Sequence, residues 1–294
     1  MIYDVKHVTT YSYEAPVTFA RCSLRLTPCS SSGQTVIASG ITLDPPPATM
    51  DRRVCFFGNL VTYLTIDRPH DEIVFTARAR VDVHRQPLPA AFSDETLEAV
   101  RDAAANAFLA GGDAPAHFMF PSHRVPRYAP AVDYARQSFP EGRPALDGAV
   151  DLMRRIRKDF RYDPDSTKVW TPLSEAFQQR SGVCQDFAHI MIAGLRGLGL
   201  PAAYVSGYLR TIPPPGQPRL EGADATHAWV NVWCGARVGW IGLDPTNAIP
   251  AGDDHIVLAL GRDYADVAPI DGVLFGAGDQ NVKVSVDVTE VAQA

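Results

Sequence analysis

The sequence predicts an α+β fold, because its first part alternates like a set of strands and its second part mixes helices with strands. No helical period of any length occurs before residue 90, and the composition changes at Gln86-Pro87-Leu88-Pro89. An apolar helix pattern then precedes three strand candidates, which predicts a helix packed on an antiparallel sheet. We expect an amino-terminal β-sandwich domain over 1–88, a helical and Pro-rich connection over 89–145, and a mixed core over 146–294.

Short strands separated by turn residues predict the β-sandwich. The longest alternating runs are 35–43 and 72–83, and Gly58-Asn59 is the predicted turn of a hairpin. The full set of expected strands is 2–8, 24–26, 35–43, 54–57, 60–66 and 72–83.

Helix signals begin after the change of composition. Ser93 is the expected N-cap of a helix that runs to Leu109 and ends at Gly111-Gly112. The other expected elements are helices over 146–160, 174–179 and 184–198, and strands over 203–209, 227–233 and 239–243.

Composition excludes several function classes. Hydrophobic residues make up 46% and charged residues 20% of the 294 residues, and the net charge of -6 offers no basic face, so we expect no nucleic-acid partner. No stretch approaches the ~18 uninterrupted apolar residues of a spanning helix, and the amino terminus shows no signal pattern, so we expect a soluble, cytoplasmic protein without membrane contact. The five cysteines lack metal-ligand spacing, so we expect no metal and no cofactor.

Cys184 stands in a setting that favours reactivity. It begins the apolar helix pattern directly after Gly182-Val183, and we expect the glycine to let the chain turn tightly. A helix N-terminus stabilises a thiolate through its unpaired backbone N–H groups and the positive end of its dipole. The same N–H groups, including one from Gln185, are suited to hold a developing oxyanion.

A thiol nucleophile needs a base and a group that orients the base. His227 begins a predicted strand, and Asp244 ends the next one, directly before Pro245. If the two strands are neighbours, both side chains emerge at one edge of the sheet, where the carboxylate would hold the imidazole. We therefore expect Cys184, His227 and Asp244 to form a catalytic triad, although each alone is explicable as packing or turn chemistry.

Three motifs in this order carry a family resemblance. Residues 181–189 (SGVCQDFAH), 226–230 (THAWV) and 243–247 (LDPTN) resemble the Cys, His and Asp motifs of the bacterial transglutaminase-like cysteine protease family. Residues 261–267 resemble a segment that often follows the Asp motif, and the first half, including Phe57-Gly58-Asn59, is similar to the family's amino-terminal β-rich domain. The resemblance implies a papain-like, transglutaminase-like core and thiol-dependent acyl chemistry on amides.

The resemblance leaves the acyl acceptor open, since family members include proteases, amidases and cross-linking transglutaminases. We favour a peptidase or amidase acting on a peptide or protein substrate, because the long extra β domains of the animal cross-linking enzymes are missing and no EF-hand loop is visible. Amine transfer to glutamine is the close alternative, and a non-catalytic binding or assembly module is the third. The sequence leaves the oligomeric state open.

Other polar and aromatic residues have two readings each. Trp170, Gln185 and Tyr208 are candidate substrate contacts, although packing explains both aromatic residues equally well. Asp186 and His189 follow Cys184 on the helix, and we expect structural roles for both, Asp186 as an acid in the first turn. We expect Asp253-Asp254-His255 to be a solvated loop rather than a metal site.

Overall fold

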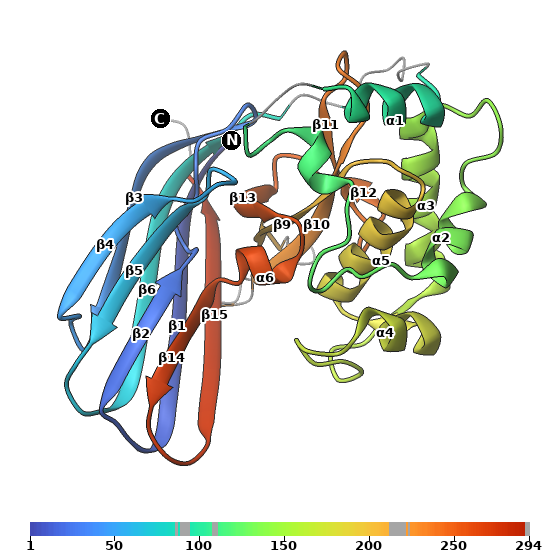
Figure 1. The fold of residues 1–294 in the computed structure, drawn as a ribbon. Coiled ribbons are helices and arrows are strands. Elements are labelled where there is room, and N and C mark those ends of the chain that lie inside the picture. The colour runs from blue at the N-terminus through green and yellow to red at the C-terminus, as the bar shows by residue number, and fades with distance from the viewer. Residues whose placement is uncertain (86–87, 89–94, 108–110, 212–221, 223, 292–294) are drawn as a thin grey trace, which may run out of the picture.

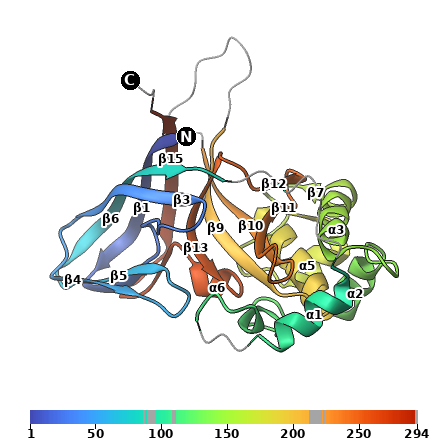
Figure 2. The same ribbon diagram turned by 90° about the horizontal axis from the view of Figure 1, so that it is seen from above.

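The structure is a computed structural model that describes residues 1–294 except 86–87, 89–94, 108–110, 212–221, 223 and 292–294. A β-sandwich lies on one side of the molecule, and a core of helices and sheet lies on the other (Figure 1). Seen from above, the core sheet lies between the helices and the sandwich (Figure 2). This arrangement confirms the predicted α+β fold with an amino-terminal β-rich part.

Two antiparallel four-stranded sheets form the sandwich. The first has the order β15-β1-β6-β3 and consists of β1 (Ile2–Val17), β3 (Gln34–Asp44), β6 (His70–Val83) and β15 (Gln280–Glu290). The second has the order β14-β2-β5-β4 and consists of β2 (Phe19–Leu24), β4 (Thr49–Val54), β5 (Leu60–Ile66) and β14 (Ile270–Phe275).

One face of the first sheet packs against both the second sheet of the sandwich and the core sheet, as the residues of β6 show. Every second residue of β6 points to the same face. Near its start Ile73 and Phe75 belong to the apolar interior of the sandwich, whereas near its end Val81 and Val83 pack against the core sheet. A single alternating strand thus holds the sandwich together and attaches it to the core.

The core surrounds α5, a helix whose residues after Cys184 are almost all buried. α5 packs against three helices and against β9 and β10. The helices of the core are α1 (Leu97–Ala105), the 3-10 helix η1 (Pro115–Phe118), α2 (Ala129–Arg136), α3 (Ala145–Asp159), α4 (Leu173–Gln179), α5 (Cys184–Gly197) and α6 (Tyr264–Val267).

The core sheet has five antiparallel strands in the order β12-β11-β10-β9-β13. They are β9 (Ala202–Leu209), β10 (Ala225–Trp233), β11 (Trp240–Asp244), β12 (Ile249–Pro250) and β13 (His255–Gly261). A short parallel pair, β7 (Arg161–Tyr162) and β8 (Ser181–Gly182), precedes α5.

Most expected elements occur within a few residues of their predicted bounds, but two strands and the first helix differ. The strands expected over 24–26 and 54–57 lie instead at Phe19–Leu24 and Thr49–Val54. α1 begins at Leu97, and the side chain of Thr96 caps it by accepting from the N–H of Ala99 at 3.3 Å. The expected N-cap, Ser93, and the expected end, Leu109, lie outside the described residues. Local pattern marked the helix but not its boundaries, which depend on which polar side chain reaches a free N–H group.

The carboxyl-terminal strands differ from the expected division of the chain. β14 pairs with β2, and β15 pairs with β1, so both belong to the sandwich sheets, although residues 146–294 were expected in the core. The connection over 89–145 also packs into the core, through Val100 of α1 and Tyr134 of α2. Alternation predicts a strand, but it does not say which sheet the strand joins.

Within the described part of the chain, no helix combines the length and the apolar character needed to cross a membrane.

Candidate active site

Cys184 is the first residue of α5 and is partly exposed, while the rest of the helix start is closely held. The carboxylate of Asp186 accepts from the N–H of Val183 at 2.9 Å and from the hydroxyl of Thr167 at 2.7 Å. Burial raises the pKa of Asp186, whereas these two hydrogen bonds lower it. Asp186 therefore caps the helix that carries the thiol, which agrees with its expected structural role.

Gly182 is required by a close approach rather than by the expected tight turn. It lies in β8, and its φ is outside the positive range. A Cβ atom added to Gly182 would lie 2.6 Å from Oδ2 of Asp186. The glycine makes room for the capping carboxylate, and thereby for the geometry that places Cys184 at the helix start.

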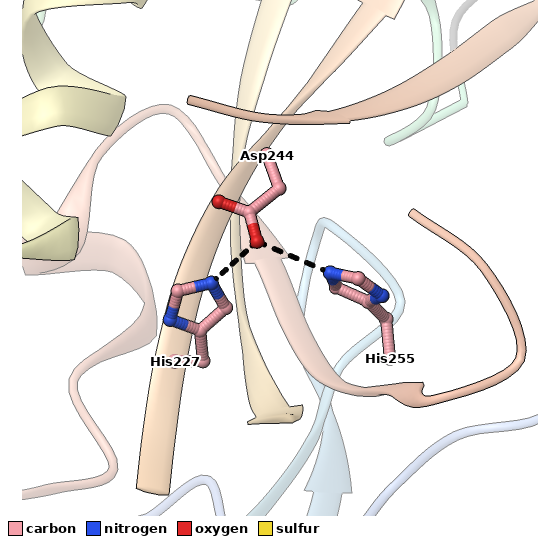
Figure 3. A group of neighbouring side chains, drawn as sticks. All are labelled: His227, Asp244 and His255. Atoms are coloured by element: carbon pink, nitrogen blue, oxygen red, sulfur yellow. Dashed lines mark hydrogen bonds and ion pairs between the residues drawn. The ribbon is translucent and has the colours of Figure 1, made fainter. Parts of the chain in front are cut away.

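His227 and Asp244 come from neighbouring antiparallel strands, β10 and β11. His227 Nε2 lies 2.8 Å from Oδ2 of Asp244, which is completely buried (Figure 3). Because Nε2 faces the carboxylate, Nδ1 is the ring nitrogen left for the thiol. Cys184 acts on His227 through a hydrogen bond and through its charge, so the structure brings all three expected residues together.

The charges of this group support one another. Burial alone lowers the pKa of His227, but hydrogen bonds with Asp244 and Cys184, and their charges, raise it to about 10. Burial raises the pKa of Asp244, but hydrogen bonds from His227, His255 and Asn247 hold it well below its usual range. At neutral pH His227 is therefore an imidazolium that lies between the carboxylate of Asp244 and Cys184.

Two polar residues at the site were missed by the sequence reasoning. Asn247 donates its side-chain amide to Oδ2 of Asp244 at 2.7 Å. The Nε2 atom of His255 lies 3.3 Å from the same oxygen, and only 1% of His255 is exposed. Asn247 could have been found from the sequence, because it belongs to the Asp motif at 243–247. His255 could not, because it follows two acidic residues in a polar run that predicted solvent exposure.

The expectation of a solvated loop over 253–255 holds for Asp253, which is exposed in a turn, but is wrong for His255. His255 is buried, and Asp254 accepts from the hydroxyl of Tyr3 at 3.1 Å and pairs with Arg210 at 2.9 Å. The segment attaches the core to β1 of the sandwich, and this long-range contact is invisible to local composition.

His227, Asp244 and His255 resemble a metal-ligand set, since one ligand atom of each lies within 4.8 Å of the others. The tautomer of His255, however, argues against metal binding. The N–H of Gly252 donates to Nδ1 of His255 at 3.2 Å, so Nε2 carries the ring proton and donates to Asp244. A metal at Nε2 would need the opposite tautomer.

The expected substrate contacts fall into three different settings. Trp170 is 71% exposed on the loop before α4. Gln185 is buried and donates its side-chain amide to the carbonyl of Val169 at 3.0 Å, which attaches that loop to the start of α5. Tyr208 is fully buried between the core sheet and the sandwich and bonds His7 at 2.9 Å, so it does not meet the expectation of a substrate contact.

Tyr162 is a further neighbour of the thiol that the sequence did not indicate. It is 49% exposed in β7, which pairs with β8 directly before α5. Burial raises the pKa of Tyr162, and the charge of Cys184 adds to this.

By contrast, His189 is buried and accepts from the N–H of Tyr264 at 3.2 Å, in keeping with its expected structural role.

Two family models match the chain in sequence order. The bacterial transglutaminase-like N-terminal region matches residues 3–82, and the transglutaminase-like superfamily matches residues 133–245. An uncharacterised protein of Mycobacterium tuberculosis is 40% identical over 291 residues, covering 97% of this chain and 92% of that protein. The chain belongs to the transglutaminase-like superfamily.

Two more proteins are similar to this transglutaminase-like protein, one in structure and one in part of its sequence. A solved structure from Cytophaga hutchinsonii, described as a candidate cysteine protease, has a TM-score of 0.76 at 21% identity and covers 100% of this chain and 92% of its own, which supports the fold. A protein-glutamine gamma-glutamyltransferase of Pseudomonas aeruginosa is 32% identical over 133 residues, covering 44% of this chain but 20% of that protein.

Proposed function

We propose that the protein is a cysteine-dependent acyl-transfer enzyme that hydrolyses amide or peptide bonds through a thioester at Cys184. One observation carries the proposal: His227 is held by Asp244 through Nε2 at 2.8 Å and interacts with Cys184 by a hydrogen bond and by charge. In this arrangement a thiolate nucleophile is paired with an imidazolium that an acid orients.

Acylation follows from this pair. The Cys184 thiolate attacks the carbonyl carbon, a C–S bond forms, and the carbonyl electrons move to oxygen. Backbone N–H groups in the first turn of α5 have no intrahelical partner and suit this oxyanion. When the intermediate collapses, the C–N bond breaks, and His227 gives its Nδ1 proton to the leaving amine. The acyl group remains on Cys184 as a thioester.

Deacylation reverses the proton transfer. Neutral His227 takes a proton from water at Nδ1 while the water oxygen attacks the thioester carbon. The C–S bond breaks, the carboxylic acid product leaves, and the thiolate and imidazolium are restored. Throughout, Asp244 keeps the ring oriented and remains ionised.

We place the acyl side of the substrate along the loop before α4. Trp170 and Val169 are exposed there, and Gln185 ties this loop to the helix that carries the thiol. Exposed Tyr162 lies on the neighbouring short strand β7. Exposed aromatic side chains beside a nucleophile suit the flanking residues of a peptide.

Amine transfer to glutamine is the second candidate, favoured by the similarity to the Pseudomonas glutamyltransferase over 133 residues. Both reactions share the thioester, so they differ in the acceptor alone. A glutamine-containing peptide with a labelled amine separates them: incorporation exceeding hydrolysis would establish transfer. A binding module without chemistry is disfavoured, because Cys184, His227 and Asp244 are all retained.

The test compares C184A with C55A, which removes a second partly exposed thiol elsewhere. On a panel of peptides and amides we expect C184A to lose at least about 1,000-fold in kcat/KM, and C55A to match the wild type. Mass spectrometry of the quenched wild-type reaction should find the acyl group on Cys184. Unchanged turnover in C184A would overturn the proposal.

We also propose that the enzyme acts in the cytoplasm, because its thiol nucleophile and four further free cysteines stay reduced there. Fractionation of the native cells, followed by immunoblotting, tests this. Recovery in a membrane or extracytoplasmic fraction would contradict it.

A further inference from the structure

His255 opens β13 and reaches the buried carboxylate that orients His227. Its Nε2 lies 3.3 Å from Oδ2 of Asp244, the oxygen that His227 contacts at 2.8 Å (Figure 3). Two imidazoles from different strands thus converge on a single carboxylate oxygen. The proposed mechanism uses one of them and leaves the other without a stated role.

The protonation of His255 follows from its second nitrogen. Nδ1 accepts from the N–H of Gly252 at 3.2 Å, so the ring proton stands on Nε2 and is donated to Asp244. The charged groups Arg85 and Asp253, which lie near His255, contact its backbone or each other rather than its ring. Arg85 donates to its backbone carbonyl at 2.9 Å, and Asp253 accepts from the N–H of Arg85 at 3.0 Å. His255 is therefore a neutral donor with one defined tautomer.

Neighbouring rings hold His255 in place. Trp229 meets its ring edge-on, with centroids 5.2 Å apart and an interplanar angle of 79°. Trp229 also stacks on His227, with centroids 6.2 Å apart and an angle of 30°. Because all three rings are buried, a displacement of His255 acts on His227 through Asp244 and through Trp229.

We propose that His255 is a positioning residue for the His227–Asp244 pair, a neutral N–H donor that fixes which carboxylate oxygen faces the base. The inference rests on the proposed function of Cys184 and His227. His255 acts through Asp244 and touches no reacting atom. A donor in this place restricts rotation of the carboxylate and favours its charged form, which in turn favours the imidazolium.

The experiment compares two substitutions of His255. H255Q keeps an N–H donor near the position of Nε2, whereas H255F keeps a flat ring without a donor. The probe is iodoacetamide, with alkylation of Cys184 followed by peptide mass spectrometry across a pH series, because it needs no knowledge of the substrate. His227 is followed in the same samples by NMR of labelled imidazoles.

We expect H255F to slow alkylation of Cys184 at neutral pH about tenfold, as the loss of one hydrogen bond to a charged group allows. Its alkylation profile should move to higher pH, and the pKa of His227 should fall. H255Q should recover most of both effects. If H255F does not fold, H255N, which is polar but too short to reach Asp244, replaces it. A purely structural role would lower the melting temperature without moving either pH profile.

The controls separate this inference from the proposed function. If wild-type Cys184 reacts no faster than Cys22 or Cys29, the proposed function fails. If wild-type alkylation is fast and lost in H227A, yet H255F keeps the wild-type rate and pH profile, the positioning role alone is overturned.

Discussion

Asp244 accepts hydrogen bonds from two histidines, an asparagine amide and two backbone N–H groups, although its side chain is fully buried. The backbone donors belong to Thr246 and Asn247, at 2.9 and 3.2 Å from Oδ1. A buried carboxylate is costly unless its lone pairs are satisfied, and here the donors do so. This network explains why His227, itself buried, is charged rather than neutral.

The D244N substitution tests this at the residue scale. Without the carboxylate, the burial that lowers the pKa of His227 is no longer opposed by Asp244, so we expect the pKa to fall from about 10 by at least about two units. NMR of labelled imidazoles measures it. D254N, which changes a carboxylate bonded to Tyr3, is the matched control and should leave His227 unchanged. An unchanged pKa in D244N would refute the assignment.

The ion pair of His227 and Asp244 should also make the free energy of unfolding depend on pH, in a direction that follows from the two pKa shifts. The contribution of His227 is fully present below its unfolded pKa of 6.5 and is lost as pH rises through about 10. The contribution of Asp244 to stability is present above its unfolded pKa of 3.8, and it is lost as the pH falls through its lower folded pKa. Urea unfolding should therefore show D244N costing about 3–5 kcal/mol near pH 6, and less near pH 10.5. An equal cost at both would count against the charged pair.

At the scale of elements, the start of α5 depends on a contact across the preceding strand. Asp186 links the N–H of Val183 to the hydroxyl of Thr167, and Gly182 leaves the space for it. At the other end of the helix, an added Cβ on Gly197 would clash with Val132 of α2, at 2.1 Å. Small residues thus set how closely the surrounding elements approach the helix that presents the thiol.

The G182A substitution tests the capping contact. The new Cβ would push the Asp186 carboxylate off its donors, so we expect a loss of about 1–3 kcal/mol in the free energy of unfolding and slower alkylation of Cys184. G40A, at a strand glycine with open space, is the matched control. In a D186G background, G182A should cost less, because the carboxylate oxygen and the Cβ atom of Asp186 that the new methyl group would meet at 2.6 and 2.8 Å are both gone. An undiminished cost in that background would place the strain elsewhere.

At the scale of the whole molecule, the two ends of the chain build the sandwich together. β15 pairs with β1 along most of its length, and Val286 and Val288 enter the apolar cluster between the sandwich and the core sheet. Tyr3 of β1 and Tyr208 of β9 belong to the same cluster. The last strand therefore contributes to holding the sandwich against the core.

A pair of valines on β15 tests this. Val288 is fully buried, whereas Val284, on the same strand and face, is 49% exposed. We expect V288A to lower the free energy of unfolding by about 2 kcal/mol, and V284A by less than about 0.5 kcal/mol. Urea unfolding followed by fluorescence measures both. Equal effects would mean that β15 is not packed as described.

Local pattern predicted the fold class, which the structure confirms, and together with the motif resemblance it singled out Cys184, His227 and Asp244, whose catalytic role stays a prediction. Strand alternation, the apolar helix pattern over 184–198 and the motifs around Cys184, His227 and Asp244 are short-range features, and the structure brings these three side chains together. Their order along the chain is enough because neighbouring strands usually pair.

Long-range pairing supplied the rest. His255 looks solvated in its own sequence and becomes buried because β13 pairs with β9, beside Trp229 and Asp244. Likewise β15 alternates like any strand, and its place beside β1 depends on contacts across nearly the whole chain. Burial and strand partnership are properties of the assembled sheets, so the composition of a short segment does not contain them.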